Sequence, residues 1–133
     1  MSELTTNSTA IPNERTQVRL SNKCHSILTQ MKEDGYLAEM TDGYRLGIAL
    51  ALSMGAQLDE LSAENRNFIA VSTLDPTGEI AAAIRMLVNL EGQSVYGYAE
   101  RLADWGIKEM QTRFKGGFLD VASLMNTAAE MAT

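Results

Sequence analysis

The chain has 133 residues, enough for one domain, and its hydrophobic residues make up 45% of the total, enough for a core. Its formal net charge of −6 argues against a protein that binds polyanions indiscriminately, because such binding rests on many Lys and Arg side chains. The charge is uneven, however, since Arg15, Arg19, Lys23 and Lys32 occupy a segment that contains no acidic residue.

The cysteine usage and the N-terminal sequence bear on the cellular compartment. Cys24 is the only cysteine, so no internal disulfide can form, which suits a reducing environment. The polar residues 1–13 lack the apolar segment of a signal peptide, and no apolar run reaches the roughly 18 residues of a membrane span. We therefore expect a cytoplasmic protein without membrane contact.

Composition and periodicity divide the chain into three parts. Residues 1–13 are rich in Ser, Thr and Asn and contain Pro12, which is typical of a disordered arm. Residues 14–55 contain a strand-like run and two helical patterns, and residues 56–133 contain further helical patterns. The predicted fold is mainly α, with a short N-terminal strand, a helix pair and a C-terminal helical bundle.

The strand-like run covers residues 15–20, where polar and apolar side chains alternate. Arg15, Gln17 and Arg19 would share one face of this strand, and Thr16, Val18 and Leu20 would share the other. A strand this short needs a partner strand. The same strand of a second copy, related by a two-fold axis, is the simplest partner, and the resulting ribbon would carry a cationic face.

Two helices are expected after this strand. Ser21 can cap a helix over residues 22–34, and Gly35 is placed to end it. A second helix, over about residues 42–54, is almost entirely apolar, which indicates burial on all sides. This helix is either the central helix of a monomeric bundle or a helix that packs against its own copy. For the oligomer, the predicted interface residues are Val18, Leu20, Tyr44, Ile48, Leu50 and Leu52.

The C-terminal module is expected to be helical, with one ambiguous run. Residues 68–71 fit either a strand or a buried helical turn, since periodicity cannot separate the two. Asp75 followed by Pro76 predicts the start of a helix that continues to about residue 90. Further helices are expected over residues 94–105, ended by Gly106, over residues 107–114 and over residues 118–131.

The residues that catalysis or metal binding would need are sparse. The only histidine, His25, follows Cys24 directly on a predicted helix, so the two side chains point in different directions and form no dyad. A structural zinc site needs four Cys or His ligands. The glycines match neither a Walker A motif nor a dinucleotide-binding motif. We expect no enzymatic activity, no cofactor and no metal.

Recognition of nucleic acid remains as a function that these residues can support. Arg15, Gln17 and Arg19 are residue types that bind phosphates and base edges, and a two-stranded ribbon fits the major groove of DNA. Lys23 lies close in sequence and joins them as a candidate. The alternative is an ordinary exposed edge strand that its arginines keep soluble.

The order of strand, helix, glycine turn and helix over residues 15–55 resembles the ribbon-helix-helix fold of small dimeric prokaryotic DNA-binding proteins. The runs Val18-Arg19-Leu20-Ser21 and Arg45 to Ser53 are also similar to the DndE family of DNA sulfur modification proteins. This resemblance implies a small helical oligomer that accompanies DNA-modifying enzymes in bacterial phage defence and that binds DNA without catalysis. Residues 36–40 are long for a ribbon-helix-helix turn, and residues 56–133 have no counterpart in that fold.

Two functions of different classes follow from the sequence. The first is a non-enzymatic, homo-oligomeric DNA-binding accessory protein of a prokaryotic DNA-modification or phage-defence system, which would also contact a larger protein of that system. The second is a structural or adaptor subunit that docks another protein through its acidic helical C-terminal module and binds no nucleic acid.

Overall fold

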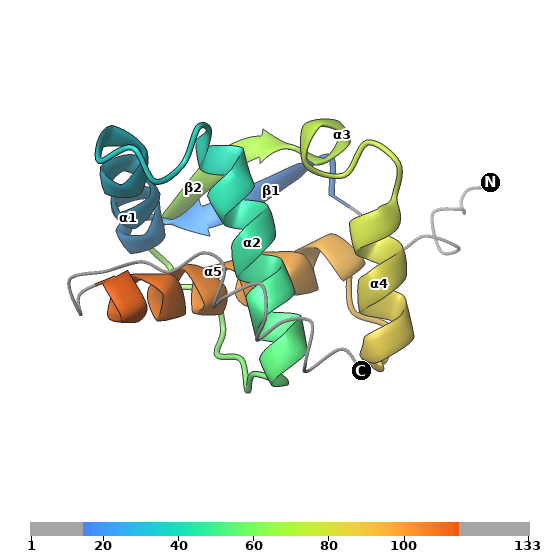
Figure 1. The fold of residues 1–133 in the computed structure, drawn as a ribbon. Helices are drawn as coiled ribbons and strands as arrows, with labels where there is room; N and C mark the ends of the chain where they lie inside the picture. Colours follow the sequence, from blue (N-terminus) through green and yellow to red (C-terminus); the bar gives the residue numbers. More distant parts are fainter. Residues whose placement is uncertain (1–14, 115–133) are drawn as a thin grey trace.

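The computed structural model describes residues 15–114, so the predicted arm over residues 1–13 and the predicted helix over residues 118–131 lie outside the described part. The elements follow in the order β1 (Gln17–Ser21), α1 (Asn22–Glu33), α2 (Met40–Met54), β2 (Asn65–Ala70), α3 (Val71–Leu74), α4 (Glu79–Leu87) and α5 (Val95–Phe114). The described part is mostly helical and contains one two-stranded antiparallel sheet (Figure 1). The mainly α class is therefore confirmed.

The strand β1 pairs with β2 of the same chain, which corrects the expectation of a ribbon shared between two copies. Val18 lies opposite Ile69, and the register is irregular between Val18 and Arg19. The ambiguous run over residues 68–71 thus supplies the second half of the missing strand, up to Ala70, and Val71 begins α3. A partner strand within the chain satisfies the backbone of β1 at the cost of one loop closure, so no second copy is required for this pairing.

The helix pair follows the sequence signals closely. The Ser21 hydroxyl accepts a hydrogen bond from the backbone N–H of Cys24 at 3.2 Å and caps α1. Gly55 ends α2 in the left-handed conformation, with φ of +59°, which glycine adopts without steric cost. The helix α2 begins at Met40, two residues before the expected start at residue 42.

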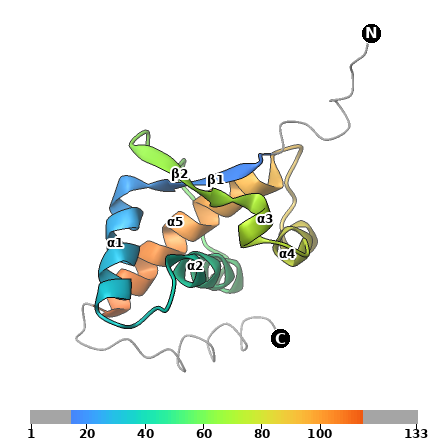
Figure 2. The ribbon, with the colours of Figure 1, turned by 90° about the horizontal axis from the view of Figure 1, so that it is seen from above.

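The helix α5 occupies the centre of the fold. It contacts β1, α1, α2 and α4, and Figure 2 shows it passing between the two-stranded sheet and α2. The sequence predicts two helices here, divided at Gly106, but α5 continues without interruption. Gly106 lies where α5 crosses α2, and a Cβ atom at this position would collide with the backbone of Gly47. Close helix packing thus outweighs the low helix propensity of glycine.

The helix α4 begins later than the sequence predicts. Residues 76–78 form a turn, and the Asp75 carboxylate accepts hydrogen bonds from the backbone N–H groups of Ile80 and Ala81 at 2.9 and 3.0 Å. The Tyr96 hydroxyl of α5 donates a third hydrogen bond to Asp75 at 2.8 Å. Asp75 therefore caps α4 across the turn and also fixes α4 against α5.

Candidate nucleic-acid interface

The predicted DNA-contact residues Arg15, just before β1, and Gln17 and Arg19, on β1, lie on one partly exposed face. The side chains of Arg15 and Arg19 retain 34% and 38% of their accessible surface, and Gln17 is exposed. Val18, between them, is fully buried. The predicted alternation is therefore confirmed from Gln17 to Leu20, whereas Thr16, predicted on the face of Val18, is exposed and precedes the strand. Lys23 is exposed on the first turn of α1, but it lines neither of the hollows that adjoin the arginines.

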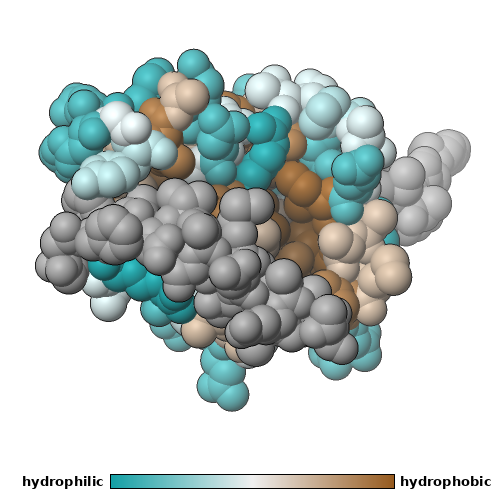
Figure 3. Space-filling model, in the orientation of Figure 1, coloured by the Kyte–Doolittle hydropathy of each residue, from teal (hydrophilic) through white to brown (hydrophobic). Residues whose placement is uncertain are grey.

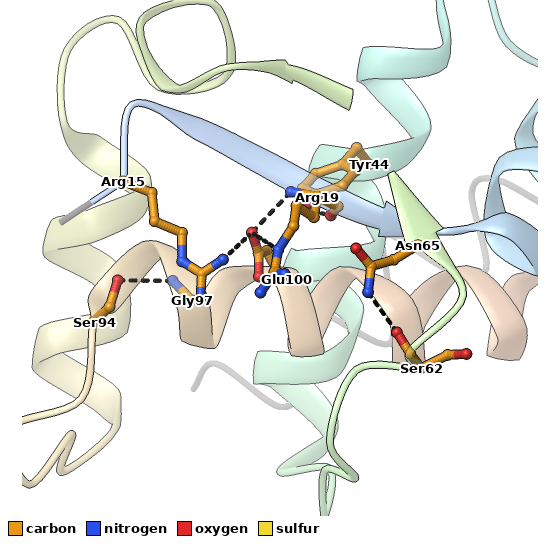
Figure 4. A network of polar contacts seen from close by, with 8 residues as sticks. All are labelled: Arg15, Arg19, Tyr44, Ser62, Asn65, Ser94, Gly97 and Glu100. Atoms are coloured by element: carbon orange, nitrogen blue, oxygen red, sulfur yellow. Dashed lines mark hydrogen bonds and ion pairs between the residues drawn. The ribbon is translucent and has the colours of Figure 1, made fainter. Parts of the chain in front are cut away.

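A carboxylate from α5 holds the two arginines in place. Oε2 of Glu100 accepts hydrogen bonds from Arg15 Nη1 at 3.1 Å and from the backbone N–H of Arg19 at 2.8 Å. Nε of Arg19 lies 3.5 Å from the same oxygen. Figure 4 shows both side chains converging on Glu100, Arg19 from β1 and Arg15 from the segment before it. Because Glu100 is only 2% exposed, its carboxylate is compensated by these two arginines and not by solvent. The same contacts order the two arginine side chains.

The first turn of α5 forms the floor beside Arg15. The Ser94 hydroxyl accepts a hydrogen bond from the backbone N–H of Gly97 at 3.0 Å and caps the helix. A Cβ atom on Gly97 would lie 3.4 Å from Nη2 of Arg15 and 3.3 Å from the Cβ of Ser94. The absence of a side chain at Gly97 therefore lets the guanidinium group lie close to the backbone of the helix (Figure 4).

Two surface hollows adjoin the arginines. The first, here called the arginine hollow, has a volume of about 370 Å³, and the second, the strand hollow, has about 540 Å³. Arg15 and Arg19 line both hollows. Thr16, together with Gln17 of β1 and Asn67 of β2, completes the strand hollow, and Arg101 of α5 lines the arginine hollow.

Glu100 and Arg101 are the residues of this interface that sequence reasoning missed. Both lie more than 80 residues after Arg15 along the chain, in the C-terminal module to which protein docking was assigned. One signal was available for Glu100, because it shares a helical stripe with the buried Tyr96, Ala103 and Ile107. A carboxylate on an apolar stripe, here Glu100 with Asp104 one turn later, requires a partner that compensates its burial.

The predicted oligomer interface residues lie largely inside a single chain. Val18, Leu20, Tyr44, Ile48 and Leu50 are at most 2% exposed and belong to the core, and Leu52 is half-buried against it. These residues pack within the chain because α5 covers α2 and β2 pairs with β1. In this chain the first five are therefore core residues and not surface residues open to a second copy, whereas self-association of the chain stays a prediction.

The other chemistry-bearing side chains have structural surroundings. Cys24 is fully buried, and its burial, followed by its hydrogen bond with Asp104, raises the pKa of the thiol to about 12. The ring of His25 packs edge-on against that of Phe68. No group of three His, Cys, Asp or Glu residues within residues 15–114 is arranged to hold a metal ion.

No helix in the described part of the chain is both long enough and apolar enough to cross a membrane. Comparisons with models of known protein families, with curated proteins and with solved structures find no match to this chain.

Proposed function

We propose that this chain is a non-enzymatic DNA-binding accessory protein that contacts the phosphate backbone through Arg15, Gln17 and Arg19. The observation that carries the proposal is a pair of guanidinium groups, from Arg19 of β1 and from Arg15 just before it, which the buried Glu100 orders and which surface hollows adjoin. Arginine donors that are fixed in advance lose less conformational entropy when they bind phosphate. The resemblance of residues 18–21 and 45–53 to DndE proteins supports a prokaryotic DNA-modification or phage-defence setting.

We also propose that the chain self-associates, through a surface different from the one that the sequence predicts. Half-buried and exposed apolar side chains of α2 and α4 lie around a hollow of about 210 Å³. Met86 and Leu87, near the end of α4, are 84% and 68% exposed. We define the apolar surface as Ala49, Leu52, Ile80, Ala83, Met86 and Leu87. Figure 3 shows brown surface between α2 and α4.

The same apolar surface favours the second candidate function, an adaptor subunit that docks another protein. Its chemistry suits an apolar partner helix, and exposed apolar patches mark interaction sites on proteins. In the accessory-protein proposal this surface takes a second copy, and the larger protein of the system binds the oligomer. In the adaptor alternative the larger protein itself covers the surface, and the arginines of β1 only stabilise the fold.

The test must remove the two arginine charges without leaving Glu100 unpaired in the interior, because an orphaned buried carboxylate is strongly destabilising. We therefore combine Arg15→Gln, Arg19→Gln and Glu100→Gln in one variant. Fluorescence anisotropy with a labelled duplex should show weaker binding. The slope of the logarithm of the binding constant against the logarithm of the salt concentration should also become shallower by about two units, because two fewer phosphates are neutralised when the duplex binds.

Two controls accompany this variant. Glu100→Gln alone retains both arginines and should bind the duplex at least as tightly as the parent protein. Lys32→Gln with Arg85→Gln removes two charges from α1 and α4, at a distance from β1, and should leave the salt dependence unchanged. If the triple variant is folded by circular dichroism and binds the duplex like the parent protein, the face of β1 is not the DNA-binding surface.

A further inference from the structure

The arginine hollow has a third guanidinium group, whose charge no carboxylate of the described chain neutralises. Arg101 donates to the backbone carbonyls of Leu58 and Asp59 at 3.2 and 3.0 Å and to the side-chain oxygen of Gln93 at 3.3 Å. All three acceptors are neutral, and no salt bridge of Arg101 occurs within residues 15–114. By contrast, Arg15 and Arg19 share the charge of Glu100.

The geometry leaves donor capacity on Arg101. A guanidinium group has five N–H donors in a fixed plane, and the three hydrogen bonds to Leu58, Asp59 and Gln93 use one each. The ring of Tyr98 lies 5.5 Å from the guanidinium carbon and restrains the orientation of the plane. Arg101 is thus a positioned cation in the wall of a hollow.

The remaining walls add a second source of positive potential. The arginine hollow is lined by Ser94 and Gly97 in the first turn of α5, and the amino end of this 20-residue helix carries the positive end of its dipole. Glu100 and Glu60 oppose an anion. The charge of Glu100 is already shared between two arginines, and Glu60 is exposed to solvent, which screens its charge.

We propose that the arginine hollow binds the phosphate group of a phosphate ester and that Arg101 is its principal recognition residue. Three guanidinium groups face two carboxylates there, and a volume of about 370 Å³ lies at the low end for small-ligand sites. The ester is either a backbone phosphate of DNA lying on β1 or a free phosphorylated molecule of mononucleotide size. Only the first of these sources rests on the proposed function.

The test is a titration of ¹⁵N-labelled protein with inorganic phosphate and with adenosine monophosphate, followed by NMR shifts of the amides of residues 94–98 and of the arginine Nε–H groups. Both probes should shift these signals, and Arg101→Gln should weaken binding of the mononucleotide about tenfold, as expected when a charge-assisted hydrogen bond is removed. Arg113→Gln, at the opposite end of α5, is the matched control and should leave binding unchanged.

Arg101 also holds the backbone carbonyls of Leu58 and Asp59, so its replacement changes local structure as well as the charge of the hollow. A second variant therefore tests the hollow without changing Arg101. Glu60→Gln removes an exposed carboxylate from the hollow, so it should tighten binding of both probes by roughly threefold at low salt. The proposal is overturned if neither probe shifts these signals in the parent protein, or if Arg101→Gln and Arg113→Gln have equal effects.

Duplex binding distinguishes the two sources of the phosphate. If Arg101→Gln weakens the duplex and the mononucleotide in parallel, the hollow receives a phosphate of the DNA backbone. If only mononucleotide binding is abolished, the hollow serves a free phosphorylated ligand. If the parent protein binds the mononucleotide but no duplex, the proposed function fails while this inference stands.

Discussion

Glu100 is a carboxylate on the buried stripe of α5, and Arg19 of β1 and Arg15 just before it both turn toward it. The alternation over residues 15–20 was sufficient to predict which face of β1 would carry Arg15 and Arg19. It could not predict that a residue about 80 positions away would share their charge. The excess positive charge expected for residues 15–32 is therefore partly neutralised, and the face depends on tertiary structure that no local pattern encodes.

Asp75 provides a prediction at the residue scale. Burial raises the pKa of this carboxyl, but hydrogen bonds from the backbone of Ile80 and Ala81 and from the Tyr96 hydroxyl outweigh it, so the pKa is lowered from 3.8. A lowered pKa in the folded state contributes stability above pH 3.8, and that stability is lost as the pH falls through the folded-state value.

We expect Asp75→Ala to lower the free energy of unfolding at neutral pH by about 1–2 kcal/mol, the range for a missing helix cap. The decrease in stability between pH 5 and pH 2 should be shallower than in the parent protein, because the titrating carboxylate is absent. Urea denaturation at several pH values measures both effects. Equal stability of the two proteins at neutral pH would contradict the capping role.

At the scale of elements, predictions of single helices and of their ends agreed best with the structure. The Ser21 cap, the Gly55 stop and the span of α1 were all encoded locally. The pairing of β1 with β2 and the continuity of α5 through Gly106 were not. Both depend on contacts between residues far apart in sequence, and a glycine at a helix crossing has the same local signature as a glycine that ends a helix.

The crossing of α2 and α5 leads to a stability prediction. Gly106→Ala places a methyl group against the backbone of Gly47, so the helices must separate. We expect the free energy of unfolding to fall by about 2 kcal/mol or more, even though alanine is the better helix former by about 1 kcal/mol. Gly97→Ala, in the same helix, is the matched control and should change stability by less than about 1 kcal/mol.

Urea denaturation followed by circular dichroism gives both values. A Gly106→Ala variant as stable as Gly97→Ala would show that α2 and α5 are not in close contact at this point.

At the scale of the whole molecule, the sequence correctly indicated a mainly helical chain with an apolar α2, but it left open what covers that helix. In the structure, α5 covers the inner side of α2, so the core residues of α2 are buried within the chain. The apolar surface beside α4 remains as the proposed site of self-association. Leu52, which was predicted for an oligomer interface, lines the hollow at this surface.

Self-association through the apolar surface can be tested by placing charges on it. Met86→Glu with Leu87→Lys leaves the net charge unchanged and should convert an oligomer into monomers, because burial of charged groups at an apolar interface is costly. Light scattering measures the mass, and Ser26→Glu with Thr112→Lys is the control on exposed positions of α1 and α5. An unchanged oligomer mass in the first variant would exclude this surface from the interface.

The measurement that tests DNA binding most directly is the light-scattering mass of the parent protein, alone and with a short duplex, at about 50 mM and about 200 mM salt. We predict that the mass rises by that of bound duplex at the lower salt concentration and returns to that of the protein alone at the higher one. A mass that does not respond to duplex at either salt concentration would contradict the account and favour the adaptor subunit.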